Sequence, residues 1–125
     1  GQGLALKENP SYDPRDQGSH LPPFMHADPA RQRAMLASDE RFAHVVCRCE
    51  QVTEGDVRAC MHELIPPTSF DGVKRRLRCS MGRCQGGFCT PRVVDIMADE
   101  WGIAASAVVK SDERGGHLVK RTVKR

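Results

Sequence analysis

The sequence has few aromatic residues and no long apolar run. Among its 125 residues are one Trp, one Tyr and four Phe, so a core has to be built from Val, Ile, Leu, Met and Ala. A small core of this kind usually needs a metal or a disulfide to stabilise it. No stretch is long enough to span a bilayer, and no G-x-G-x-x-G fingerprint follows a strand and opens a helix. We therefore expect one small domain with an arm, with no transmembrane segment and no nucleotide-binding enzyme domain.

The charge balance is also modest. The formal net charge of +3 is too small to indicate a nucleic-acid partner. The first residues, Gly1 to Leu4, lack the charged-then-apolar pattern of a secretory signal. We therefore expect a cytoplasmic location, where the six cysteines stay reduced and more often bind metal than form disulfides.

Residues 1–43 are predicted to be an N-terminal arm or connector with one short helix. Asn9-Pro10 and Asp13-Pro14 interrupt a stretch without apolar periodicity. Asp28 is a suitable N-cap, Pro29 suits the first helical position, and Ala30 to Ala37 favour a helix. Ser38-Asp39 can cap another turn that carries Phe42.

Residues 44–110 contain the clearest pattern of helices. His44 to Cys49 is predicted to be extended, and alternation places Val45, Cys47 and Cys49 on one face. Thr53 with Asp56 forms a variant of the capping box, and an apolar stripe of Val57, Cys60, Met61 and Leu64 predicts a helix that stops before Pro66.

Two further helices follow. One is predicted to begin at Thr68 or Ser69 and to bury Phe70, Val73 and Leu77. The next has Thr90 as N-cap, Pro91 at its first position and Gly102 as C-cap. Ile103 to Val109 is predicted to form a short fourth helix.

Residues 111–125 are predicted to be a basic tail that contains a short strand, His117 to Val123. A pairing of Val45-Val46 with Leu118-Val119 is one arrangement that the sequence allows. The fold class is therefore mainly α: a small bundle of three to four short helices, a short extended segment carrying C-x-C, and an N-terminal arm.

Two cysteine pairs dominate the candidate site: Cys47 and Cys49 are spaced C-x-C, and Cys84 and Cys89 are spaced C-x4-C. Four thiolates can complete the ligand shell of iron or zinc. A C-x-C pair on extended backbone fits the tight turn around a single zinc ion poorly, because zinc sites usually place two to four residues between paired cysteines. The spacing therefore favours an iron–sulfur cluster, but structural zinc and disulfide or incidental cysteines also remain open.

The surroundings of the cysteine pairs favour negative charge. Each pair comes shortly before a predicted helix start, where the helix dipole stabilises anions. Basic residues that lie close to the pairs in sequence would ease reduction of a cluster, or would form a solvated face. These residues are Arg48, Lys74, Arg75, Arg76, Arg78, Arg83 and Arg92.

Other residues near the pairs are assigned as follows. Cys60 lies on an apolar stripe and is expected to be a buried structural thiol. Cys79 repeats the x4 spacing with Cys84, so it is an alternate ligand or a disulfide partner, although four cysteines already suffice. His44 as a Rieske-type ligand is a weaker alternative. Phe88 either shields the site from water or simply packs, and Met81 and Trp101 are expected to fill the core.

A wider set of motifs resembles a known family. The motifs are Val45 to Glu50, Val52 to Gly55, Asp71 to Arg76, and Met81 to Arg92 with its MGRCQGGFCTPR sequence. Together they resemble the C-terminal domain, similar to bacterioferritin-associated ferredoxin, of flavin-dependent glycerol-3-phosphate dehydrogenases and related FAD oxidoreductases. Leu4 to Arg15 resembles the connector that leaves the flavin domain in that family.

The resemblance implies a [2Fe-2S] cluster held by Cys47, Cys49, Cys84 and Cys89, and a role in one-electron transfer. It also implies FAD in an upstream domain of the same polypeptide and an electron acceptor protein or quinone-linked subunit downstream, with the parent enzyme at the inner face of a membrane. Two features differ: the ferredoxin itself has a C-x2-C second pair, and no flavin or substrate domain lies in these 125 residues. The alternatives are a structural zinc module that mediates subunit contacts and an assembly or regulatory module that hands a cluster onward.

Overall fold

The structure is a computed structural model and describes residues 22–111. This part of the chain contains four α-helices, one two-stranded hairpin and three 3-10 turns. In chain order they are η1 (Phe24–His26), α1 (Pro29–Ser38), η2 (Glu40–Ala43), β1 (Val45–Cys47), β2 (Val52–Thr53), α2 (Glu54–Met61), α3 (Phe70–Leu77), α4 (Cys89–Trp101) and η3 (Ala105–Ala107). The predicted mainly helical class is confirmed.

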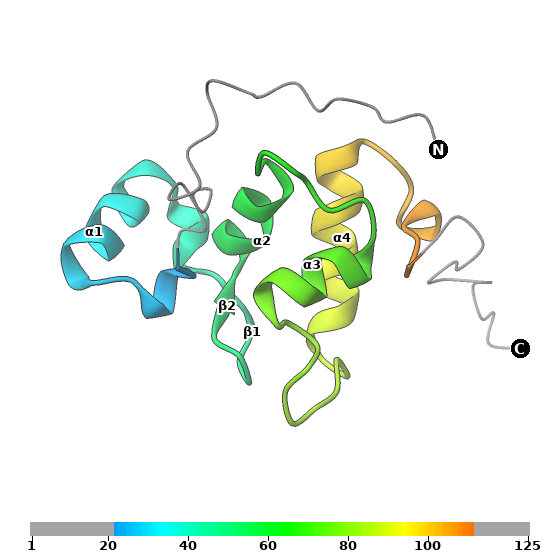
Figure 1. Ribbon diagram of the computed structural model, residues 1–125, viewed down its shortest axis with the longest axis horizontal. Coiled ribbons are helices and arrows are strands. Elements are labelled where there is room, and N and C mark those ends of the chain that lie inside the picture. The colour runs from blue at the N-terminus through cyan, green and yellow to red at the C-terminus, as the bar shows by residue number, and fades with distance from the viewer. Residues whose placement is uncertain (1–21, 112–125) are drawn as a thin grey trace, which may run out of the picture.

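Helices α2, α3 and α4 pack together, and α1 lies to one side of them (Figure 1). The β1–β2 hairpin and the loop between α3 and α4 both extend toward the same end of the molecule (Figure 1). Two segments that are distant in sequence therefore meet there, and each carries a cysteine pair.

The core is aliphatic, as the scarcity of aromatic residues predicted. Val57, Val73, Val93 and Met97 are fully buried, and Ile96 is 1% exposed. Trp101 packs against this core while remaining half-buried. Burial of this apolar surface stabilises the arrangement of the three packed helices.

Three of the predicted helix starts are confirmed. The Asp28 carboxylate accepts hydrogen bonds from the backbone N–H groups of Ala30 and Arg31, which caps α1. Thr53 and Asp56 form a complete capping box on α2. The Ser69 hydroxyl accepts from the Gly72 N–H and caps α3. Short polar side chains at these positions satisfy N–H groups that have no partner within the helix.

Two predicted helix boundaries are wrong. Helix α2 ends at Met61, and Leu64, expected on its buried stripe, is 96% exposed. Helix α4 begins at Cys89 rather than after a Thr90 cap, and its N-cap residue Phe88 makes no side-chain capping bond. The reason is that the Thr90 N–H already donates to the Gly86 carbonyl at 3.1 Å, which is the first helical bond.

Two further expectations about local structure are also wrong. Within Ile103 to Val109, only the 3-10 turn η3 forms, because the chain then extends and its Val109 carbonyl accepts the Phe70 N–H at the start of α3. The alternation predicted for the strand fails as well. The pairing of β1 with β2 is irregular between Val45 and Cys47, and Val45 is 51% exposed while Cys47 is 1% exposed.

The partner of β1 is β2, the next strand along the chain. Val45 pairs with Thr53, and Cys47 pairs with Val52, in an antiparallel hairpin. Leu118-Val119, the strand at 117–123 and the connector at 4–15 lie outside the described residues. Among residues 22–111, no helix is both long and apolar enough to cross a membrane.

Candidate metal centre

The hairpin places the first cysteine pair. Cys47 ends β1 and is buried, whereas Cys49 lies in the exposed turn that joins the two strands. Gln51 in that turn has a φ of 53°, so the backbone reverses sharply before β2. The strand therefore fixes Cys47, and the turn brings Cys49 back toward the same side.

The loop before α4 places the second pair. The Gln85 N–H donates to the Gly82 carbonyl at 2.9 Å, and the Gly87 N–H donates to the Cys84 carbonyl at 2.9 Å. Gly86 has a φ of 84°, a conformation that favours glycine. These two tight turns fold the loop back so that Cys84 lies opposite Cys89, the first residue of α4.

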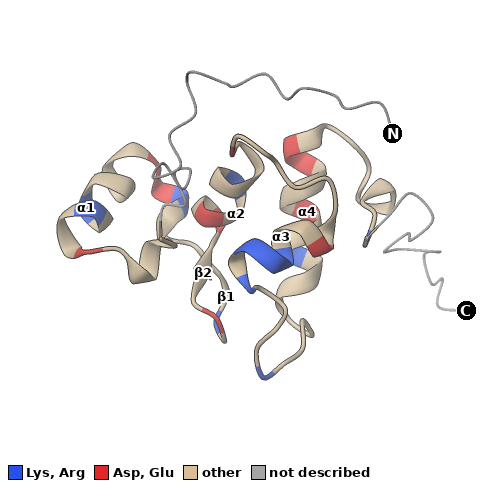
Figure 2. Ribbon diagram, in the orientation of Figure 1, with Lys and Arg blue, Asp and Glu red and all other residues tan. Residues whose placement is uncertain are grey.

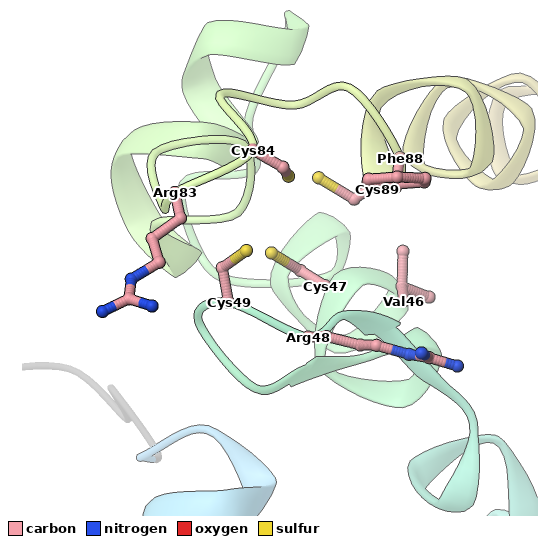
Figure 3. A pocket seen from close by; sticks show the side chains of 8 residues that line it. All are labelled: Val46, Cys47, Arg48, Cys49, Arg83, Cys84, Phe88 and Cys89. Atoms are coloured by element: carbon pink, nitrogen blue, oxygen red, sulfur yellow. The ribbon is translucent and has the colours of Figure 1, made fainter.

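All four predicted ligands line one cavity. Its volume is about 650 Å³, and the sulfurs of the two segments face one another across it (Figure 3). The other lining residues are Val46, Arg48, Arg83 and Phe88. Strict alternation places Val46 on the face opposite Cys47, but the pairing is irregular between Val45 and Cys47, and Val46 lines the same cavity.

The sulfurs form two pairs that each join the two segments. Cys49 lies close enough to Cys84 to lower its pKa, and Cys47 lies close enough to Cys89 to raise its pKa. Cys47 and Cys89 are each 1% exposed, whereas Cys49 is exposed and Cys84 is half-buried. The cavity thus has an inner and an outer sulfur pair. Among residues 22–111, no three Cys, His, Asp or Glu side chains are grouped around the position of a single ion.

The two residues of the second pair differ in their electrostatic surroundings. The backbone N–H of Phe88, followed by that of Gly86, lowers the pKa of Cys84, with a smaller contribution from Gly87. Burial raises the pKa of Cys89, and a hydrogen bond from Ser80 opposes this effect. Amide donors aimed at Cys84 stabilise a negative sulfur there.

The remaining cysteines and His44 do not line the cavity. Cys60 and Cys79 are buried, and burial raises the pKa of each to about 12. Cys60 is therefore the buried thiol that was expected. His44 lies at the surface with its Nδ1 3.6 Å from the Glu54 carboxylate.

Only two of the seven basic residues line the cavity, namely Arg48 and Arg83, and their side chains point away from the sulfurs (Figure 3). Lys74, Arg75 and Arg76 lie on α3, where Figure 2 shows a basic stretch of the ribbon, and none of them lines the cavity. Arg78 pairs with Glu50 at 3.2 Å, and Arg92 pairs with Glu54 at 2.8 Å.

Some of the surrounding residues were missed or misjudged from sequence. Met81, expected in the core, is 41% exposed. Phe88, for which the sequence left shielding or simple packing open, lines the cavity and is 87% exposed. Ser80 was not singled out, although its hydroxyl lies 3.3 Å from the Cys89 sulfur. Nothing in a single sequence distinguishes this serine from a loop serine, because only folding of the loop brings it against Cys89.

Comparison with models of protein families relates the segment that carries both cysteine pairs to a known domain family. The model of the BFD-like [2Fe-2S] binding domain matches residues 45–99. Residues 45–99 belong to this family. The matched range begins at β1 and ends within α4, so it includes both cysteine segments of the BFD-like domain.

Similar proteins are larger oxidoreductases. The chain is 38% identical over 99 residues to a glycerol 3-phosphate dehydrogenase of Caloramator mitchellensis, a match that covers 79% of this chain and 20% of that protein. It is 43% identical over 56 residues to an opine oxidase subunit of Rhizobium meliloti, covering 45% of this chain and 10% of that protein. It is 34% identical over 74 residues to an anaerobic glycerol-3-phosphate dehydrogenase subunit of Escherichia coli, a match that covers 59% of this chain and 13% of that protein.

The chain thus spans a fifth or less of the length of these curated relatives. No solved structure matches the chain.

Proposed function

We propose that the BFD-like domain holds a [2Fe-2S] cluster on Cys47, Cys49, Cys84 and Cys89 and serves in one-electron transfer. The observation that carries this proposal is the meeting of four sulfurs, from two segments distant in sequence, around one cavity. Four thiolates are the usual ligand set of such a cluster. The family match to residues 45–99 supports the same cofactor.

The donor arrangement fits a cluster better than one zinc ion. A single tetrahedral zinc needs four sulfurs about 2.3 Å from one point. Here the sulfurs form an inner pair, Cys47 with Cys89, and an outer pair, Cys49 with Cys84. Among residues 22–111, no three candidate ligands are grouped around the position of one ion, whereas two pairs of sulfurs match a body with two metal ions. The amide donors to Cys84 and the helix start at Cys89 further support a site with net negative charge.

The residues that line the cavity have different roles in this proposal. When bound, the cluster supplies a centre that accepts and returns one electron at a time. Buried Cys47 and Cys89 anchor the inner side, and Cys49 and Cys84 hold the side nearest solvent, where electrons would enter and leave. Phe88 and Val46 also line the cavity, and Val46, the less exposed of the two, limits access of water.

The electron donor that we propose is a reduced flavin in an upstream domain of the same polypeptide. A reduced flavin holds two electrons, which leave singly, and its protons pass to solvent. The acceptor is a one-electron carrier protein or a quinone-linked subunit. The resemblance to flavin-dependent glycerol-3-phosphate dehydrogenases motivates this proposal, and relatives that carry the dehydrogenase name support it. The same resemblance leads us to propose that the parent enzyme lies at the cytoplasmic face of a membrane. The exposed Arg48 and Arg83 beside the cavity suit a partner with an acidic surface.

The test is a reductive titration of anaerobically assembled protein with dithionite. We expect charge-transfer absorption that bleaches after about one electron per chain, with an electron-spin signal in the reduced state. Absorption that dithionite does not bleach, or a protein that assembles no chromophore, would refute the proposal. Rapid transfer of the cluster to an apo-acceptor, without reversible reduction, would instead support the assembly module.

A further inference from the structure

Ser80 has a backbone conformation that a residue with a side chain rarely adopts. Its φ is 67°, in the left-handed region that favours glycine. Three other non-glycine residues in the described part of the chain have positive φ: Gln51, Arg78 and Gln85. Those three are exposed, whereas Ser80 is 6% exposed. A buried serine in this conformation needs a compensating interaction of its side chain.

The hydroxyl of Ser80 has two close partners. Its Oγ lies 3.3 Å from the Sγ of Cys89 and 3.2 Å from the Oγ1 of Thr90. Gly86 leaves room for this arrangement, because a Cβ there would lie 2.4 Å from Thr90 Oγ1 and 3.1 Å from Ser80 Cβ. The loop is thus built closely around a pair of hydroxyl groups beside one cysteine.

The direction of these hydrogen bonds follows from the state of Cys89. A metal-bound thiolate has no proton, so its sulfur can only accept, and the Ser80 O–H has to donate to it. The Ser80 oxygen is then free to accept the Thr90 O–H. Hydroxyl groups linked in this way polarise one another and strengthen the bond to sulfur.

We propose that Ser80, supported by Thr90, is a positioning residue that raises the reduction potential of the cluster by donating a hydrogen bond to Cys89. This inference rests on the proposed function. An added electron makes the ligand sulfurs more negative, and a donor aimed at one of them then stabilises the reduced state more than the oxidised state. The buried setting of Ser80 and Cys89 increases the effect, because water does not screen it.

The experiment compares the midpoint potentials of five variants with that of the wild type, all assembled anaerobically. Ser80→Ala removes the hydroxyl and keeps the Cβ, whereas Ser80→Gly removes the hydroxyl and relieves the backbone. We expect the midpoint potentials of both Ser80 variants to shift to more negative values by similar amounts. Thr90→Val should cause a smaller shift in the same direction, and Thr90→Ser should return the potential toward the wild-type value. Ser106→Ala changes an exposed serine of η3 and should leave the midpoint potential unchanged.

Three results would overturn the inference. The first is an unchanged potential in both Ser80 variants with the cluster intact. The second is a shift in Ser80→Ala without one in Ser80→Gly, since that would report backbone strain. The third is loss of the cluster from both variants, which would make Ser80 a residue of the fold alone. Failure of the wild type to assemble any cluster would instead contradict the proposed function, so the two failures are distinguishable.

Discussion

Gly82 lies directly against Cys49. A Cβ at position 82 would stand 2.2 Å from the Cβ of Cys49 and 3.4 Å from its Sγ. The loop that carries Cys84 can therefore approach the hairpin turn only because residue 82 has no side chain. This contact sets how closely the two cysteine segments meet.

Gly82→Ala should accordingly impair cluster binding. The new methyl group has to push Cys49 away, and overpacking of this kind costs about 1–3 kcal/mol. We expect the variant to keep its helical circular dichroism and to lose most of its charge-transfer absorbance. Gly102→Ala is the matched control: it has open space but a φ of 62°, so it should lower stability by about 1 kcal/mol and keep the cluster. Equal cluster content in Gly82→Ala and wild type would show that the contact does not position Cys49.

Cysteine substitutions should fall into two groups. Serine at position 47, 49, 84 or 89 should abolish the cluster, because each removes a proposed ligand. Cys60→Ala and Cys79→Ala should retain it and lower the free energy of unfolding by about 1 kcal/mol, since both thiols are buried outside the cavity. Iron content and thermal unfolding check both parts. A Cys79→Ala protein without iron would instead make Cys79 a ligand.

Acid should weaken the fold through Glu54. Burial favours its protonated form, but hydrogen bonds from Arg58 and Arg92 outweigh this and lower the pKa of Glu54 below 4.5. Arg58 also hydrogen-bonds to Glu100 and to Asp99, so one cluster of charges joins α2 to α4. A lowered pKa in the folded state means that the unfolded state binds more protons. The stabilisation is therefore complete above about pH 4.5 and is lost as the pH falls through the lower pKa of the folded protein.

Glu54→Gln should show this dependence directly. We expect it to cost about 1–3 kcal/mol at pH 7, and its melting temperature should fall less than that of wild type between pH 5 and pH 3. Glu40→Gln, at an exposed position of η2, is the control and should behave as wild type. Parallel melting curves for Glu54→Gln and wild type over this pH range would contradict the account.

Charge beside the cavity should affect electron transfer to an anion. Ferricyanide is a one-electron acceptor with a strong negative charge, so Arg48 and Arg83 should speed its approach to the reduced site. Reversal of both charges, in Arg48→Glu with Arg83→Glu, should slow oxidation by ferricyanide several-fold at low salt, and the difference should shrink at high salt. Arg33→Glu, on the exposed side of α1, should have little effect. A rate that is insensitive to the double reversal would place the exit for electrons elsewhere.

The sequence was informative where signals are local. The caps Asp28, Thr53 and Ser69 follow from side-chain chemistry within three residues, and each begins a helix as expected. The C-x-C and C-x4-C spacings, with the family resemblance, identified the four cysteines that line the cavity. These features depend little on long-range packing.

The details that failed depend on contacts between distant segments. Helix α4 begins at Cys89 because the loop folds back through Gly86. Ile103 to Val109 forms only the 3-10 turn η3, and its last carbonyl, that of Val109, accepts the Phe70 N–H at the start of α3. Likewise, the roles of Ser80 and Gly82 follow from contacts that form only in the folded chain, where the loop packs against Cys89 of α4 and Cys49 of the hairpin turn. No periodicity or spacing along the chain carries such information.

The most direct test of the central claim is the metal and sulfide content of the protein, purified and assembled without oxygen. We expect about two iron and two acid-labile sulfide per chain, and neither in Cys84→Ser. About one zinc per chain without sulfide, retained by the wild type after assembly with iron and sulfide, would contradict the central claim.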